Sequence, residues 1–146
     1  MSLTDNNLID WTVYGRARSE LGADFVRILG YFSEDGAKSV EAIEQAVRSL
    51  NVVAIVIPAH TLKGESRQFG AEPLGDLAET IEAEARACIE RRDTPETLVE
   101  HVVKLRPLFE ASLALLQREA NPLVARRAPT AGFGKRPAVG GGFGRA

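Results

Sequence analysis

Residues 25–50 decide the fold, and they read FVRILGYFSEDGAKSVEAIEQAVRSL. Their apolar residues recur in steps of four and three, which is the period of one helix face. The pair Asp35-Gly36 often marks a turn, but the phase of the pattern continues through it. We therefore predict one long helix with Gly36 in its buried seam, where glycine costs about 1 kcal/mol against alanine unless close helix contact offsets the loss. The series consists of Phe25, Leu29, Phe32, Gly36, Val40, Ile43, Val47 and Leu50.

The same spacing recurs along the rest of residues 1–120. No stretch longer than a few residues alternates apolar and polar residues as a strand does. A short first helix is expected from Asp5 to about Gly15. Asn51 is a suitable N-cap for a helix that should end near Gly70, and two further helices should open at Pro73 and Pro95. The predicted fold class is all-α: an antiparallel up-down-up-down four-helix bundle with an additional short N-terminal helix.

The composition favours one domain in a reducing compartment. The chain has 146 residues, of which 45% are hydrophobic, so one core of ordinary size is expected. Its single cysteine, Cys88, excludes an internal disulfide framework. No charged-then-apolar leader opens the sequence, and the apolar run 52–59 is too short to span a bilayer. We expect a cytoplasmic protein without a membrane partner.

Charge divides the chain into two parts. Residues 1–120 hold 13 basic and 20 acidic side chains, whereas residues 121–146 hold five basic residues, six glycines and three prolines and no acid. We therefore predict a helical bundle over 1–120 and a disordered basic Gly/Pro-rich tail over 121–146. The tail repeats Gly-Phe-Gly before Lys135 and Arg145, which suits either a solvated appendage or a basic peptide for a partner, nucleic acid or an anionic surface. We favour the appendage and expect no nucleic acid.

The segment His60-Thr61-Leu62-Lys63-Gly64 carries the chemistry. A helix turns by about 100° per residue, which places Lys63, Gly64 and Arg67 within about 60° of His60. One face of the helix thus offers an imidazole, two cations and a patch of bare backbone. A neutral imidazole nitrogen is a competent nucleophile near pH 7, and cations neutralise phosphoryl oxygens. This face is therefore a candidate site for holding a phosphoryl group.

Attack by His60 on an aspartyl phosphate of a partner would give a phosphohistidine, and the step would reverse with the next partner. Lys63 and Arg67 are the candidate phosphoryl contacts. The chain offers no acidic cluster placed to hold magnesium, so we expect no cofactor here and a magnesium ion on the partner.

Apolar side chains share the face of the histidine. Val53, Val56 and Ile57 project within about 60° of His60 on the same helix. Exposed apolar residues beside a reactive histidine are typical of a small, transient docking surface. Alternatively, the first helix or a second copy of the chain covers them.

The chain resembles the histidine phosphotransfer domain family over roughly residues 5–118. The likeness rests on His60-Thr61-Leu62-Lys63-Gly64, on Phe69-Gly70-Ala71, and on an acidic, apolar helix that ends in Ile81-Glu82. The resemblance implies a four-helix bundle, His60 as the phosphoacceptor, Lys63 as the neutralising cation and Gly64 as room for a docking receiver domain. It also implies a monomer that binds receiver domains of hybrid histidine kinases and response regulators. Glu65 departs from the family, which often has a small residue there; on the helix it points toward a bundle neighbour.

The resemblance therefore predicts a phosphorelay carrier without its own kinase activity or ATP site. A histidine-kinase dimerisation domain is disfavoured because Thr61 follows the histidine where an acid is usual, and because no glycine-rich nucleotide segment follows. The remaining alternative is a non-catalytic helical module that binds receivers without accepting phosphate.

Overall fold

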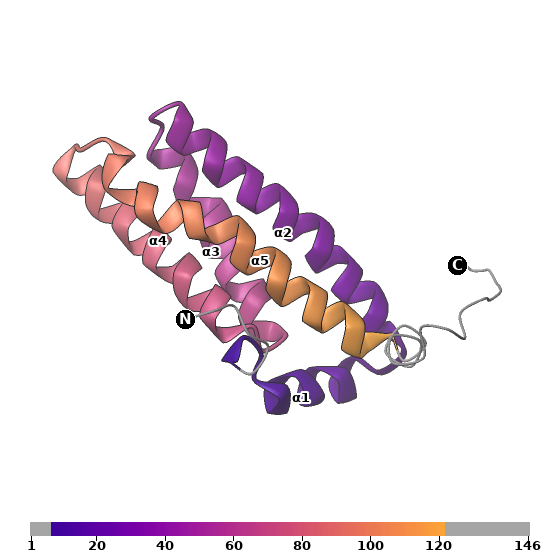
Figure 1. Cartoon of the computed structure of the whole chain (residues 1–146). Helices are drawn as coiled ribbons and strands as arrows, with labels where there is room; N and C mark the ends of the chain where they lie inside the picture. Colours follow the sequence, from indigo (N-terminus) through magenta and orange to yellow (C-terminus); the bar gives the residue numbers. More distant parts are fainter. Residues whose placement is uncertain (1–6, 122–146) are drawn as a thin grey trace. The chain divides into compact units, whose positions relative to one another are not determined.

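The computed structural model describes residues 7–121, which fold into helices and turns without a strand. The elements are α1 (Trp11–Leu21), the 3₁₀ turn η2 (Gly22–Asp24), α2 (Phe25–Arg48), α3 (Val53–Gln68), α4 (Glu72–Arg91), the 3₁₀ turn η3 (Pro95–Leu98) and α5 (Val99–Ala120). The predicted four-helix bundle with a short extra helix is confirmed (Figure 1). Within the described residues no helix is long and apolar enough to cross a membrane.

The chain divides after Leu116 into two units, and the bundle described below is the first. The second unit begins at Gln117 and contains the last turn of α5. The predicted basic tail lies outside the described residues from 122 onward. Its boundary and its lack of structure therefore stay predictions.

The long helix predicted through Gly36 is observed as α2, without a break at Asp35-Gly36. Gly36 is buried, and a β-carbon at this position would lie 2.4 Å from Cε1 of Phe109 on α5. Phe32 and Phe109 also meet edge to face, with ring centroids 5.8 Å apart. The absence of a side chain at position 36 is what allows the ring of α5 to sit against α2.

An aromatic cluster closes the end of the bundle at which α3 turns into α4. Phe69 follows α3 directly and packs against Phe25 and Phe32 of α2, at centroid distances of 5.7 and 5.5 Å. Tyr14 of α1 packs edge to face on Phe25 at 5.3 Å. The short helix α1 is therefore held on the bundle through its own aromatic ring.

The predicted bounds of the first helix are wrong. Residues 7–10 precede the helix, and α1 starts at Trp11 because the Asp10 carboxylate accepts hydrogen bonds from the backbone N–H groups of Thr12 and Val13. The helix continues past Gly15 and ends at Leu21, and Gly22 caps it with a φ of +55°, which suits a glycine. Asp10 was thus a helix start that the sequence prediction overlooked.

The predicted end of α3 agrees with the structure, and its start differs by one residue, because Val52 and not Asn51 directly precedes the first helical residue, Val53. Asn51 Oδ1 accepts a hydrogen bond from the backbone N–H of Ala54 at 3.3 Å, and Pro58 lies inside the helix. Gly70 follows the helix with a φ of +85°, and its carbonyl accepts a 2.7 Å hydrogen bond from the Asp10 N–H. Pro73 lies in the first turn of α4. The α3–α4 turn is thereby fixed to the start of α1.

We predict that Gly36→Ala destabilises the fold by about 1–3 kcal/mol, because the added methyl group displaces Phe109. The matched control is Gly30→Ala in the same helix, where nothing lies within 4 Å of the added carbon. That control should gain up to about 1 kcal/mol from helix propensity. Urea denaturation measures both free energies of unfolding, and equal effects of the two substitutions would contradict the close contact.

Candidate functional site

The site is built on α3, which packs against α2 and α4. Residues 56, 60, 63 and 67 are spaced by four, three and four, and the polar members of this stripe contact α4. The His60 side chain is 60% exposed, and its Nδ1 lies 3.1 Å from Oε2 of Glu82 on α4. The predicted histidine is therefore accessible to solvent on one side and hydrogen-bonded on the other.

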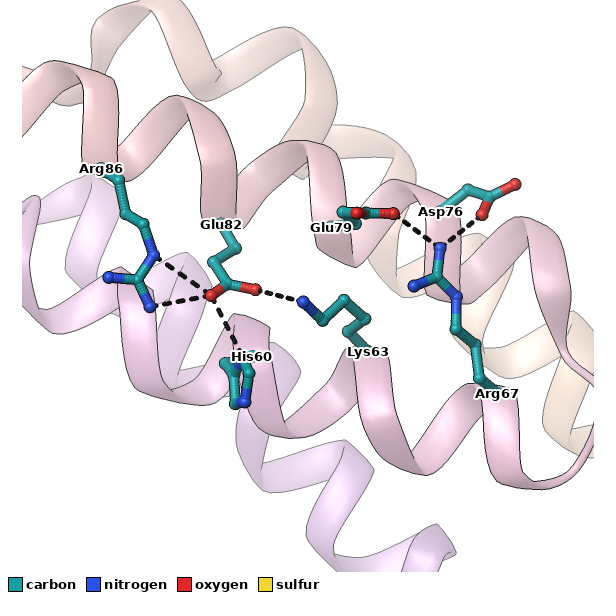
Figure 2. A network of polar contacts seen from close by, with 7 residues as sticks. All are labelled: His60, Lys63, Arg67, Asp76, Glu79, Glu82 and Arg86. Carbon is teal, nitrogen blue, oxygen red and sulfur yellow. Dashed lines mark hydrogen bonds and ion pairs between the residues drawn. The ribbon is translucent and has the colours of Figure 1, made fainter.

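Two cations share the same carboxylate. Lys63 Nζ lies 3.0 Å from Oε1 of Glu82. Arg86, one turn further along α4, places Nη2 and Nε 2.9 and 3.2 Å from Oε2. Figure 2 shows His60, Lys63 and Arg86 converging on this one carboxylate. We call these three residues and Glu82 the Glu82 cluster.

Glu82 lies on the apolar side of α4, near Ala78, Ile81 and Ala85, and its side chain is 8% exposed. Burial raises the pKa of this carboxyl, but the hydrogen bonds from Arg86, Lys63 and His60 outweigh burial and lower its pKa to about 2. The group is therefore ionised at neutral pH and can only accept hydrogen bonds.

This ionisation decides which ring nitrogen of His60 carries the proton. Because the carboxylate has no proton to donate, Nδ1 must donate its own proton across the 3.1 Å contact. In the neutral ring, Nε2 then holds the lone pair. The second ring nitrogen points away from Glu82 in Figure 2, on the exposed side of the imidazole. The site thus presents a nucleophilic nitrogen outward.

Arg67 does not join this cluster. Its Nη2 lies 2.8 Å from Asp76 Oδ1 and 2.7 Å from Glu79 Oε1, both on α4, and its stem crosses Gly75. A β-carbon at Gly75 would lie 2.8 Å from Cγ of Arg67. Figure 2 shows this guanidinium in a separate group of contacts along the same pair of helices. Arg67 therefore links α3 to α4, and the structure does not bring it to His60.

The apolar residues predicted beside His60 differ in exposure. Val53 and Ile57 are 66% and 70% exposed, and nothing lies within 4 Å of a β-carbon built on Gly64. The prediction that Val56 is exposed with them is wrong, since Val56 is only 8% exposed. It lies one turn before His60 on the stripe that faces α4, at the edge of the buried side of α3. The open apolar face consists of Val53 and Ile57.

Glu65 meets a bundle neighbour, as its place on the helix indicated. Burial raises the pKa of this carboxyl, and the Asp35 carboxylate on α2 raises it further. Among the described residues, Oε1 of Glu65 is buried without a hydrogen-bond partner. The charge of Glu65 is thus on the α2 side of α3, away from the Glu82 cluster.

Two residues of the cluster, Glu82 and Arg86, were not predicted as site residues. Glu82 appeared only as the end of an acidic, apolar helix. A usable signal was present, because a carboxylate four residues after Ala78 and three before Ala85 falls on the buried stripe of the helix. A buried carboxylate requires cationic partners, and Arg86 at i+4 is one of them.

Over residues 7–121, no group of three or more His, Cys, Asp or Glu side chains is arranged to hold a metal ion. The Glu82 cluster itself combines one carboxylate with a histidine and two cations. This combination can supply a ring nitrogen as nucleophile and two cations that could contact an anion.

The family profile described as the Hpt domain matches residues 27–119, and the chain belongs to this family. A search of curated proteins gave no match. Among solved structures, the chain is similar to histidine-containing phosphotransfer protein B from Pseudomonas aeruginosa PAO1, with a TM-score of 0.71 and 18% sequence identity. The similarity covers 79% of this chain and 96% of that chain, and it shows that the two share a fold.

We predict opposite pH effects of Glu82→Gln and Glu65→Gln on stability. The lowered pKa of Glu82 gives stability that is present above pH 4.5 and lost as pH falls toward 2, so its substitution costs about 2 kcal/mol at pH 7 and less near pH 3. The raised pKa of Glu65 gives stability that is present below pH 4.5 and lost at higher pH. Glu65→Gln should therefore stabilise the fold at pH 7, by less than about 1 kcal/mol.

Urea denaturation between pH 3 and pH 7 measures both effects. Destabilisation of equal size at every pH in both variants would contradict the assigned pKa directions.

Proposed function

We propose that this protein is a phosphorelay intermediate that accepts a phosphoryl group on His60 and passes it on. The donor would be an aspartyl phosphate of one receiver domain, and the acceptor would be an aspartate of another. One observation carries the proposal: an exposed imidazole whose Nδ1 contacts an ionised, buried carboxylate, which leaves the lone pair on the outward Nε2. Membership in the Hpt domain family supports it.

The atoms and electrons of the transfer step balance between the two proteins, without a further reactant. The lone pair of Nε2 attacks the phosphorus atom, and an N–P bond forms as the O–P bond of the aspartyl phosphate breaks. The electron pair of the broken bond stays on the aspartate oxygen, and the Nδ1 proton stays on the ring. The reverse sequence returns the phosphoryl group to a second receiver.

Two cations of the Glu82 cluster can neutralise the phosphoryl oxygens. Lys63 lies one turn from His60, and Arg86 extends from α4 toward the same carboxylate with a half-exposed side chain. We assign the second phosphoryl contact to Arg86 in place of Arg67, because Arg86 contacts the same Glu82 oxygen as His60, whereas Arg67 contacts Asp76 and Glu79. A magnesium ion, where the reaction needs one, would come with the receiver.

The receiver would dock on the open face of α3. Val53 and Ile57 supply exposed apolar area within two turns of His60, and Gly64 leaves its backbone uncovered one turn beyond. These features suit a small, transient interface with receiver domains of hybrid histidine kinases and response regulators. The protein would act as a carrier, without its own kinase activity or ATP site.

We predict that label moves from a phosphorylated receiver to the wild-type protein, whereas His60→Gln accepts at least about 100-fold less because the nucleophile is gone. His101→Gln removes the other histidine of the chain and is the matched control, which should accept label normally. Acid-labile phosphate on each protein is the readout. A His60→Gln variant that binds the receiver while the wild type takes no label would instead establish a non-catalytic receiver-binding module.

We predict that Lys63→Ala slows the transfer by about tenfold, as expected for one charge-assisted contact of the reacting group. Arg67→Ala also removes a cation of α3 and should transfer at the wild-type rate, since its partners are Asp76 and Glu79. Rapid-quench kinetics with one phosphorylated receiver compares the two. Normal kinetics in Lys63→Ala, or an equal loss in both variants, would refute the assignment.

A further inference from the structure

The contact between Glu82 and His60 bears on the release of the phosphoryl group as well as on its capture. We propose that Glu82 is a positioning residue that keeps the Nδ1 proton on the His60 ring after phosphorylation, and that this proton makes the phosphohistidine a fast donor. This inference rests on the proposed function of His60 and adds a role for a residue of α4 that acts through the ring.

The chemical reason lies in the leaving group. When the N–P bond breaks, its electron pair returns to Nε2. With a proton on Nδ1 the departing ring is a neutral imidazole, whereas without that proton it is an imidazolate anion, a far poorer leaving group. Loss of the Nδ1 proton to solvent would therefore trap the phosphoryl group on the protein.

The geometry favours retention of the proton. Oε2 of Glu82 lies 3.1 Å from Nδ1, and an opposite charge at this distance stabilises the protonated ring. Glu82 is ionised, and its 8% exposure limits the screening of this interaction by water. Because Glu82 lies on the packed side of α4, its carboxylate is held in place beside the ring.

Within residues 7–121, the other charged groups that contact the Glu82 carboxylate beside the ring are Lys63 on α3 and Arg86 on α4. Without the Glu82 carboxylate, both cations would disfavour a positively charged ring by repulsion. In the structure, however, each contacts a Glu82 oxygen, and a phosphoryl group of charge about −2 on Nε2 would attract them further. The carboxylate is then left to the Nδ1–H group. The balance of charges therefore favours the protonated phosphohistidine.

The test uses the full chain carrying His101→Gln, so that His60 is its one histidine. Phosphoramidate, a small-molecule phosphoryl donor, loads the ring without a receiver. The loss of the phosphoryl group to water is then followed by phosphorus NMR from pH 5 to pH 9. The variants are Glu82→Gln, whose amide can accept or donate and so favours neither ring state, and the matched control Glu79→Gln. Glu79 is a carboxylate on the same helix that contacts Arg67.

All three proteins should lose phosphate at rates within about twofold at pH 5, where every ring is protonated. As the pH rises, the rate of phosphate loss should begin to fall in Glu82→Gln at a pH at least about one unit lower than in the other two proteins. Near pH 9, Glu82→Gln should therefore lose phosphate about tenfold more slowly than they do. Glu79→Gln should follow the parent protein. Parallel profiles for Glu82→Gln and the parent protein, or the same shift in Glu79→Gln, would overturn the inference.

A second measurement covers the case in which Glu82→Gln does not fold. In the phosphorylated parent protein, the nitrogen-15 spectrum should show a protonated Nδ1 up to a pH about one unit higher than in free phosphohistidine in the same buffer. Identical titration of the two would overturn the inference. Because phosphoramidate needs no receiver, failure of this inference and failure of transfer from a receiver are distinguishable.

Discussion

The site depends on one buried charge, the carboxylate of Glu82. A carboxylate on the packed side of a helix is unfavourable unless cations and hydrogen-bond donors surround it, and here three donors from two helices do so. This requirement fixes α3 and α4 in one register. It also fixes the imidazole ring, because Nδ1–H is one of the donors. The orientation of the candidate nucleophile is therefore a consequence of how a charge is accommodated in the bundle.

The three sides of α3 differ in what they contact. Its buried side, with Ile55, Ala59 and Leu62, holds the helix in the core. The side toward α4 carries the polar contacts of His60, Lys63 and Arg67, and the open side presents Val53 and Ile57. A rigid helix thus sets the distance between the reactive nitrogen and the apolar face that a receiver would use. This arrangement needs no loop to close and suits a carrier that exchanges partners.

Periodicity and helix-ending residues were sufficient to predict most of the fold. The unbroken pattern through Gly36 predicted α2, and its reason became visible only when Phe109 was placed against that glycine. The predicted start of α1 was wrong because the N-cap at Asp10 was overlooked. Helical spacing located His60, Lys63 and Gly64, since these residues are neighbours on one helix. It could not assign Arg67 or Glu82 to a partner, because those contacts depend on the register between α3 and α4.

The central claim is that the buried carboxylate selects the ring form in which Nε2 is the nucleophile. The most direct measurement is a long-range proton–nitrogen-15 correlation spectrum of the unphosphorylated protein, recorded at alkaline pH. The account predicts a protonated Nδ1 and the chemical shift of an unprotonated nitrogen at Nε2. A spectrum with the proton on Nε2 would contradict it.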